Sequence, residues 1–320
     1  MSAQATMPAL IYKVRELAAD VREFTLVPGE GREFPVYSAG SHVVVGLPLG
    51  ARTQRNAYSL LGDPAQRDRW RIAVRRQQPS RGGSAWLHDE ARPGLRLELS
   101  APLNLFALVR TARHHVLVAG GIGITPILSM ARELARLGAS FEVHYACRGV
   151  DNAVFSDELE PLAGGRLNLH DSERSGRLDF DALLARQSLG SHLYICGPQG
   201  MVEDCMQAGA RQGWPASHLH SEQFLAPPHG LPFEVELALS KKRFTVPADL
   251  SLLEAIEQQG IEAPSLCRGG ACGQCELEVL DTTGTLIHHD LCLSREDRAA
   301  GRKLMPCVSR LDRGCVVLKL

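Results

Sequence analysis

Four cysteines in the last quarter of the chain restrict its fold more than any other feature of the sequence. Cys267, Cys272 and Cys275 follow the spacing C-x4-C-x2-C, and 31 residues separate Cys275 from Cys307. Three close cysteines with a distant fourth are typical of the plant-type [2Fe–2S] site. The spacing therefore predicts that these four thiolates hold a [2Fe–2S] cluster.

Small residues separate the first three cysteines: Gly269, Gly270, Ala271 and Gly273. They allow backbone N–H groups to approach the sulfur atoms, where hydrogen bonds would offset the negative charge of a cluster. A structural zinc site is the alternative, although zinc sites usually present two short cysteine pairs. Cys292 and Cys315 have no matching spacing, and we expect both to be buried as small apolar residues.

Length and charge exclude several classes of protein. A chain of 320 residues suggests two or three domains of about 100 to 150 residues each. Its 35 Lys and Arg nearly balance 36 Asp and Glu, and a pI near 6.9 leaves no basic field for a nucleic acid. We find neither an export signal nor the ~18 continuous apolar residues that cross a membrane. We therefore expect a cytoplasmic protein whose partners include neither nucleic acid nor a membrane.

The first part of the chain reads as short β segments separated by Gly, Pro and Asp turns. The segments that we expect to be strands are 21–27, 42–47, 57–61 and 70–76. One helix is expected at 84–90, with Ser84 as its N-cap and Pro93-Gly94 after its end. This pattern predicts a small antiparallel β-barrel, which we assign to residues 1–110.

From residue 111 to 225 the pattern changes to alternating strands and helices. Strands are expected at 115–119, 141–146 and 192–196, and helices at 125–137, 156–162, 180–186 and 201–212. Such alternation predicts a parallel sheet with right-handed crossovers. A segment rich in proline, 226–232, is expected to be a linker, and a third domain of mixed α and β structure occupies 233–320. It would begin with a hairpin of 233–239 and 243–246, followed by a helix at 251–259.

Two loops of the α/β domain have the composition of a nucleotide site. The first follows a predicted strand and opens a helix, and its candidate binding residues are Gly120, Gly121, Gly123, Thr125 and Pro126. Glycines let the backbone approach a diphosphate, and a helix N-terminus offers free N–H groups. The second loop, Cys196, Gly197 and Pro198, also joins a strand to a helix. Either loop read by itself is also compatible with an ordinary tight turn, with Cys196 simply buried.

Two segments of the barrel have features of a flavin site. One predicted strand carries a cation, an aromatic face and a hydroxyl, in the segment with Arg55, Asn56, Tyr58 and Ser59. These groups could hold a flavin phosphate, stack on the flavin ring and hydrogen-bond its nitrogen N5. A surface strand with a satisfied tyrosine is the alternative. Gly82, Gly83 and Ser84 offer a second anion site at the start of a helix.

With these motifs in this order, the chain resembles the ferredoxin–NADP reductase superfamily, and within it phthalate dioxygenase reductase and the vanillate O-demethylase reductases. The resemblance covers nearly the whole chain. It implies an FMN-binding barrel, an NADH-binding α/β domain and a C-terminal plant-type ferredoxin domain of the β-grasp type. The family has Arg-x-Tyr-Ser in the barrel, whereas here Arg55 precedes Tyr58 by three positions and Asn56 occupies the arginine's place. A β-bulge could restore the phosphate contact of Arg55.

The resemblance also implies roles for Ser59, Cys196 and Phe224. We expect Ser59 to donate a hydrogen bond to flavin N5, Cys196 to lie beside the nicotinamide, and Phe224 to shield the flavin ring. A core position on an edge strand is the other possibility for Phe224. The residues alone do not decide between FMN and FAD. They also do not decide between NADH and NADPH, since the one weak indication of a 2′-phosphate site is Arg148 after the second strand.

Electron counting suggests the order of transfer. NADH gives two electrons as a hydride, a [2Fe–2S] cluster takes one at a time, and a flavin between them converts the one into the other. The resemblance implies a separate Rieske-type oxygenase as the final acceptor, because the chain has no Rieske histidine pair of its own. The alternatives are a stand-alone NADH-dependent flavin reductase or oxidase, and a zinc-binding interaction protein without turnover. The substrate of the oxygenase and the oligomeric state stay open.

Overall fold

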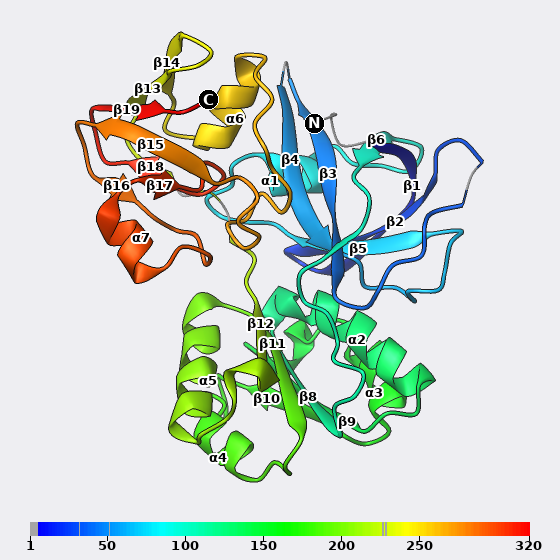
Figure 1. Cartoon of the computed structure of the whole chain (residues 1–320). Coiled ribbons are helices and arrows are strands. Elements are labelled where there is room, and N and C mark those ends of the chain that lie inside the picture. Colours follow the sequence, from blue (N-terminus) through cyan, green and yellow to red (C-terminus); the bar gives the residue numbers. More distant parts are fainter. Residues whose placement is uncertain (1–5, 32, 51, 226, 228) are drawn as a thin grey trace. The chain divides into compact units, whose positions relative to one another are not determined.

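The computed structural model describes residues 6–31, 33–50, 52–225, 227 and 229–320. It divides into two compact parts, one formed mainly by the residues from 225 onwards and the other by nearly all of the residues before it (Figure 1). Residues 226 and 228 of the expected linker lie outside the described residues. The domain boundaries at 110, 225 and 232 stay predictions.

The first domain is an antiparallel sheet with the strand order β4-β3-β6-β1-β2-β5, and β7 pairs with β3. Its elements are β1 (Met7–Ala18), β2 (Val21–Pro28), β3 (Ser41–Leu49), β4 (Arg52–Ser59), β5 (Trp70–Arg75), α1 (Gly83–Asp89), β6 (Arg96–Leu99) and β7 (Leu103–Asn104). Alternate residues point inward, so Phe24 and Leu26 of β2 meet Trp70 and Ile72 of β5 in one buried cluster. The predicted barrel-type sheet is confirmed, although β1 and β6 were not identified individually from the sequence.

The second domain is a parallel sheet with the order β10-β9-β8-β11-β12. Its strands are β8 (His114–Gly120), β9 (Phe141–Cys147), β10 (Leu167–Asp171), β11 (Ser191–Cys196) and β12 (Leu219–Glu222). Its α-helices are α2 (Ile124–Arg136), α3 (Ser156–Ala163), α4 (Phe180–Ala185) and α5 (Gln199–Arg211), and short 3₁₀ turns are η1 (Gly121–Gly123), η2 (Val150–Asn152) and η3 (Ala216–His218). The strand order reverses at β8, so β8 and β11 flank the switch point.

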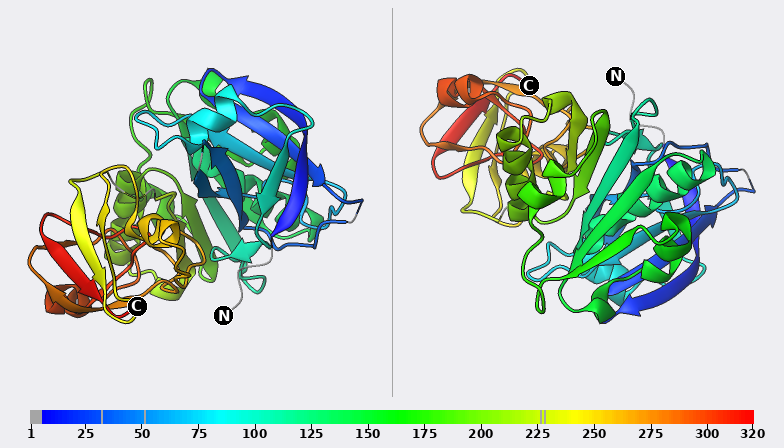
Figure 2. Two further views of the ribbon diagram at one scale, coloured as in Figure 1. Left: turned by 90° about the horizontal axis from the view of Figure 1, so that it is seen from above. Right: turned by 90° about the horizontal axis from the view of Figure 1, so that it is seen from below.

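Helices cover both faces of this sheet (Figures 1 and 2). On β8, Leu117 and Ala119 pack in the cluster of α2 and α3, whereas Val116 and Val118 pack in the cluster of α4 and α5. A strand that is buried on both faces must be apolar throughout, which explains its continuous hydrophobic sequence. Phe106 from the segment after β7 and Ala73 of β5 belong to the same cluster as α2, so the first two domains share a core.

The third domain, residues 233–320, is a mixed sheet with the order β14-β13-β19-β15-β17. Its elements are β13 (Phe233–Leu237), β14 (Lys242–Val246), α6 (Leu252–Gln258), β15 (Leu277–Thr282), β16 (Leu286–Ile287), α7 (Arg295–Ala300), β17 (Lys303–Leu304), β18 (Arg310–Leu311) and β19 (Cys315–Leu318). Ser251 caps α6, since its hydroxyl accepts from the backbone N–H of Glu254 and the Glu254 carboxylate accepts from that of Ser251. The loop between α6 and β15 carries three of the four predicted ligand cysteines.

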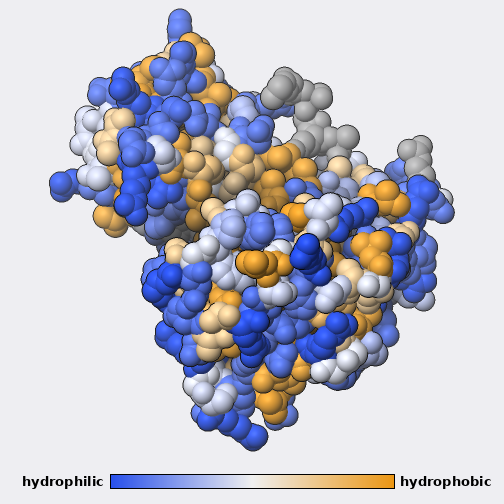
Figure 3. All heavy atoms as spheres, turned by 60° about the horizontal axis from the view of Figure 1, so that its bottom comes forward, coloured by the Kyte–Doolittle hydropathy of each residue, from blue (hydrophilic) through white to orange (hydrophobic). Residues whose placement is uncertain are grey.

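No helix among the described residues is both long enough and apolar enough to cross a membrane. On the face drawn in Figure 3, hydrophobic residues occur in small groups between hydrophilic ones. Larger apolar side chains gather instead in the buried clusters of the three sheets.

Candidate active site and metal centre

The two predicted nucleotide loops meet at the switch point of the parallel sheet. β8 and β11 are adjacent, and Ala119 pairs in register with Cys196. A Cβ added to Gly123 would lie 2.1 Å from the carbonyl oxygen of Cys196, and one added to Gly120 would lie 2.7 Å from the Pro198 ring. Only glycine fits at these positions, because the two loops contact each other backbone to backbone. This edge is where open α/β sheets bind nucleotides.

Thr125 and Pro126 shape the first loop. The Thr125 hydroxyl donates to the carbonyl oxygen of Ile122 at 3.0 Å, which closes the turn, and the side chain is almost fully buried. Pro126 lies in the first turn of α2, where a missing N–H costs no intrahelical hydrogen bond. Both residues therefore fix the conformation of the backbone at the start of α2.

Arg75 of β5 is a cation near the first loop that sequence reasoning missed. A Cβ added to Gly121 would lie 3.9 Å from Arg75 Nη1, and Arg75 is held by Asp20 at 2.7 Å. The signal in the sequence was weak, because Arg75 stands at the end of a barrel strand and about 45 residues before the glycines. A diphosphate at the glycine loop would lie within the field of this arginine.

Cys196 and Glu222 lie side by side at the carboxyl ends of β11 and β12. They are paired in register, and Cys196 is fully buried. Burial, together with the Glu222 charge, raises the pKa of the Cys196 thiol well above its ordinary value, so it stays protonated. Glu222 Oε2 is buried without a hydrogen-bond partner in the described part of the chain, and burial raises the pKa of Glu222 to about 8.

Glu222 is a candidate that the sequence did not single out, although it lies in the segment of Phe224. An unpartnered buried carboxyl group is costly and unusual, which marks it as a functional candidate. Phe224 itself follows the end of β12 and is 49% exposed. This exposure contradicts the alternative of a core phenylalanine, and the expected role of Phe224 at the flavin stays a prediction.

Ser59 ends β4 with an unsatisfied hydroxyl. Its side chain is buried, and its Oγ finds no hydrogen-bond partner among the residues that the structure describes. A buried hydroxyl without a partner fits a site completed by a ligand atom. Tyr58, the preceding residue, is half-buried and packs against the barrel core.

Arg55 lies on the opposite face of β4 from Tyr58. Gln54, Asn56 and Tyr58 are the more buried residues of the alternation, whereas Arg55 and Ala57 are exposed. The Gln54 amide donates to Asn56 Oδ1 at 3.1 Å. The structure thus places Asn56, and not Arg55, on the face of Tyr58.

The second phosphate turn differs from expectation in its cap. Helix α1 begins at Gly83, with Gly82 as N-cap at φ 108°, whereas Ser84 was expected to be the cap. Only glycine adopts this φ readily, so the turn uses Gly82 and leaves Ser84 inside the helix. The Ser84 hydroxyl accepts a hydrogen bond from the backbone N–H of Gln77 at 3.1 Å. It also shares a hydrogen bond of 3.2 Å with the Ser80 hydroxyl. The Ser84 hydroxyl therefore makes its hydrogen bonds within the turn.

The four predicted ligand cysteines come together as two pairs. The Sγ atoms of Cys275 and Cys307 lie 3.3 Å apart, and the thiols of Cys267 and Cys272 are hydrogen-bonded to each other. No three His, Cys, Asp or Glu side chains of the described ranges converge on a single ion position. Two thiol pairs suit a cluster of two bridged irons, each taking two thiolates, better than one tetrahedral zinc.

Within each thiol pair the surroundings lower the pKa of one thiol and raise that of its partner, Cys272 or Cys307. The hydrogen bond with the Cys272 thiol and the N–H groups of the loop lower the pKa of Cys267 to about 5. The backbone nitrogen of Gly269 lies 3.4 Å from Cys267 Sγ. The hydrogen bond with the Cys307 thiol lowers the pKa of Cys275. These amides are the donors expected from the small residues of the loop.

Arg268 is a buried cation that the sequence analysis overlooked. It lies inside the cysteine loop at φ 55° and makes a bidentate pair with Glu257 at 2.8 and 2.7 Å. Its charge acts on Cys307, so it adds a positive field where an anionic cluster would lie.

The expectation that Cys292 and Cys315 are buried is wrong. Cys292 is exposed, and its thiol donates to the carbonyl oxygen of Gly270 at 3.1 Å, while Cys315 is only partly buried. Cys292 thus lies against the cysteine loop without belonging to either thiol pair.

Comparisons with known proteins agree with this arrangement. Residues 101–219 match the family model of the dimethylamine monooxygenase subunit DmmA-like N-terminal domain, and residues 235–312 match that of the 2Fe-2S iron-sulfur cluster binding domain. The chain is 48% identical to the heme-dependent oxidative N-demethylase beta subunit of Ectopseudomonas mendocina over 94% of each chain. It is 40% identical to the carnitine monooxygenase reductase subunit of Escherichia coli over 97% of each chain.

A solved structure shows the same fold over the whole length. Phthalate dioxygenase reductase, described as a modular structure for electron transfer from pyridine nucleotides to [2Fe–2S], superposes with a TM-score of 0.88 at 33% identity. The match covers 99% of this chain and 98% of that one. The chain therefore belongs to the phthalate dioxygenase reductase family, oxidoreductases in which flavin-binding and NADH-binding domains precede a [2Fe–2S] ferredoxin domain.

Proposed function

We propose that this chain is the reductase component of a two-component oxygenase and passes electrons from NADH through FMN and a [2Fe–2S] cluster to a separate oxygenase. The observation that carries the proposal is the presence, in one chain, of two thiol pairs, a nucleotide-type switch point and a barrel strand that ends in an unsatisfied serine. A flavin bound in the barrel would accept a hydride and release its electrons singly, which is the chemistry that the step from nucleotide to cluster needs.

On the nucleotide side, backbone groups would do most of the binding. Gly120, Gly121 and Gly123 lie between the end of β8 and the start of α2, where a helix N-terminus attracts a diphosphate. Gly197 and Pro198 hold the neighbouring loop close to them, and Arg75 adds a positive charge.

Cys196 and Glu222 would form the wall beside the nicotinamide. Both are neutral at pH 7, because the pKa of the thiol is raised well above its ordinary value and that of the carboxyl group to about 8. A protonated Glu222 can donate a hydrogen bond to a carboxamide oxygen without placing a negative charge beside the hydride donor.

On the flavin side, Ser59 Oγ would donate to N5 and Tyr58 would stack against the ring. Asn56 would take the position next to the phosphate that Arg55 was expected to take, and the N–H groups of Gly83 and Ser84 would form the second phosphate contact. Gly82 would shape that turn, since its own N–H donates to Ser80 Oγ at 3.1 Å. Phe224 would cover the ring from the nucleotide domain. Cys267, Cys272, Cys275 and Cys307 would ligate the cluster as two pairs.

For the partner, we propose an oxygenase that removes a methyl group from an amine. The names of two matches support this proposal, the DmmA-like domain and the heme-dependent oxidative N-demethylase subunit at 48% identity. The likeness to phthalate dioxygenase reductase supports the other candidate, a Rieske-type oxygenase. We propose a cytoplasmic location because NADH, the proposed hydride donor, is a cytoplasmic metabolite, and because none of the nine cysteines is in a disulfide.

The proposal is tested with the purified holoprotein. We expect one flavin per chain, identified as FMN by mass spectrometry after denaturation, two irons and two sulfides, and bleaching by NADH faster than by NADPH. Turnover is then measured with a haem-dependent N-demethylase, with a Rieske-type oxygenase and with oxygen alone. A colourless, iron-free protein would contradict the proposal, and equal NADH consumption with and without any oxygenase would favour a stand-alone oxidase.

A further inference from the structure

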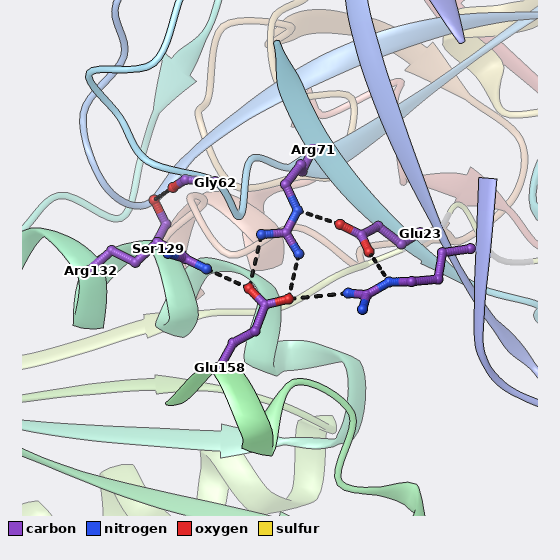
Figure 4. Close-up of polar contacts among 7 residues, drawn as sticks. Glu23, Gly62, Arg71, Ser129, Arg132 and Glu158 are labelled. Atoms are coloured by element: carbon purple, nitrogen blue, oxygen red, sulfur yellow. Dashed lines mark hydrogen bonds and ion pairs between the residues drawn. The ribbon is translucent and has the colours of Figure 1, made fainter. Parts of the chain in front are cut away.

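One carboxylate joins the nucleotide domain to the barrel. Glu158 of α3 accepts a bidentate pair of hydrogen bonds from Arg71 of β5 at 2.7 and 2.9 Å (Figure 4). It accepts a third from Arg15 of β1 at 3.1 Å. Arg132 of α2 also donates to Glu158. Glu158 therefore collects two arginines of the barrel and one of its own domain.

A second carboxylate completes the network on the barrel side. Glu23 of β2 is almost fully buried and accepts a hydrogen bond from Arg71 (Figure 4). It accepts another from Arg15 at 2.7 Å. Both barrel arginines are thus held by two carboxylates each, and their planar guanidinium groups cannot rotate without losing one of them. Glu23 therefore holds Arg15 and Arg71 in place independently of Glu158.

Charge and burial make this network stronger than an ordinary surface pair. The side chain of Glu158 is 20% exposed and that of Arg71 is 18% exposed. Burial alone would raise the pKa of Glu158, but the hydrogen bonds and charges of Arg71 and its neighbours lower it to about 2. The guanidinium of Arg71 also lies 5.7 Å from the ring centre of Phe155, the buried residue at the start of α3. Glu158 is therefore ionised and paired at every working pH.

The network reaches both halves of the candidate site through helix α2. This helix starts at the glycine loop and carries Arg132, and its Ser129 hydroxyl donates to the carbonyl oxygen of Gly62 at 3.4 Å. Gly62 lies three residues after Ser59. One helix thus connects the proposed nucleotide loop to the segment that follows the proposed N5 donor.

Apolar packing by itself does not fix the position of the nucleotide domain against the barrel. The shared core of the two domains consists of aliphatic and aromatic contacts, which tolerate sliding because they have no preferred direction. Hydride transfer needs donor and acceptor within about 3 to 3.5 Å, and a misplacement of ~1 Å can cost about a hundredfold in rate. Directional contacts across the joint are therefore needed in addition to the packing.

We propose that Glu158 is a positioning residue for hydride transfer, which fixes the nucleotide domain against the barrel by binding Arg15, Arg71 and Arg132 with one carboxylate. The inference rests on the proposed function, since the two reacting groups would be held by the two domains that this network joins. Glu158 touches neither of them, and it acts through Arg71, Arg132 and helix α2.

The test compares Glu158→Gln with Glu160→Gln, an exposed carboxylate on the same helix. In the holoprotein, we expect Glu158→Gln to slow flavin reduction at saturating NADH about tenfold or more, with less than a twofold change in the Kd for NAD⁺ and in flavin and iron content. The Glu160→Gln control should match the wild type. Unchanged flavin reduction in Glu158→Gln would overturn the proposal.

A second measurement does not depend on turnover. Hydrogen exchange of the amides in 59–62 and 124–132 should accelerate in Glu158→Gln and stay unchanged in Glu160→Gln. If Glu158→Gln does not fold, Arg71→Lys replaces it, because lysine keeps the charge and loses the bidentate geometry. If NADH fails to reduce the wild-type flavin, the proposed function fails, and unchanged exchange in the variant would separately reject the positioning role.

Discussion

Cys196 and Glu222 are register partners on neighbouring parallel strands, and both carry buried acidic groups that stay protonated at neutral pH. Two neutral donors thus lie at the edge of the sheet where the two nucleotide loops meet. The arrangement gives the candidate site a pH dependence of its own.

Glu222→Gln should remove an alkaline limb from the pH profile of flavin reduction. In the wild type the pKa of Glu222 is raised to about 8, so the protonated donor dominates below pH 8 and about one tenth of it is left at pH 9. We expect the wild-type rate to fall towards that fraction between pH 7 and 9. The glutamine variant cannot ionise and should keep a flat profile, as stopped-flow measurements would show. A limb of equal size in both proteins would exclude Glu222 as its origin.

Ser59→Ala should slow flavin reduction about tenfold, because one hydrogen bond to the reacting ring is worth ~1 to 1.5 kcal/mol. The visible spectrum of the cluster should stay unchanged. Thr53→Ala, an exposed hydroxyl on the same strand, is the control and should leave the rate as it is. Wild-type hydride transfer in Ser59→Ala would argue against the N5 contact.

Gly123→Ala should destabilise the protein by about 3 kcal/mol or more, because its Cβ would meet the backbone oxygen of Cys196 at 2.1 Å. Gly200→Ala is the matched change, since nothing lies within 4 Å of its Cβ and the residue is in α5. It should raise stability by about 0.5 to 1 kcal/mol. Thermal unfolding measures both, and equal Tm values would show that the two loops are not in contact.

Cys307→Ser should abolish the cluster, whereas Cys292→Ser should keep it. Cys307 faces Cys275 at 3.3 Å, while Cys292 lies outside both pairs and only donates to Gly270. Iron and sulfide assays with visible spectra distinguish the two variants. Loss of iron in Cys292→Ser alone would mean that the ligand set is misassigned.

Acid should weaken the parallel sheet through its histidines. Burial, followed by the charges of His218, His220 and His115, lowers the pKa of His192 to about 4, and burial lowers that of His220 as well. The unfolded chain, with an ordinary value near 6.5, binds protons first, so stability present above pH 6.5 is lost between about pH 6.5 and 4. Tm should fall by several degrees over this range.

The acid loss should be smaller in His192→Gln, which cannot titrate. His229→Gln, an exposed histidine outside the sheet, is the control and should follow the wild type. A histidine-independent loss of stability, equal in all three proteins, would trace the effect to other groups.

Much of the fold was predictable because its signals are local. The continuous apolar run at 115–119, the alternation of strands and helices after it and the helix expected at 251–259 all depend on neighbouring residues. β1 and β6 were harder, because β1 alternates irregularly through two shifts in its pairing register with β2. Ser84 was mistaken for a cap because a glycine with positive φ can take the same place.

The sequence by itself determined the chemistry that this chain can bring: four thiols in a cluster spacing, glycines at two strand ends and a serine in a barrel strand. Only the tertiary structure decided how these groups combine. It paired the thiols two by two, left Cys292 exposed, turned Arg55 away from Tyr58 and placed Glu222 beside Cys196. It also gathered Glu158 and three arginines from four elements. Spacing along the chain reports on local geometry, whereas burial and charge pairing depend on which strands the fold makes neighbours.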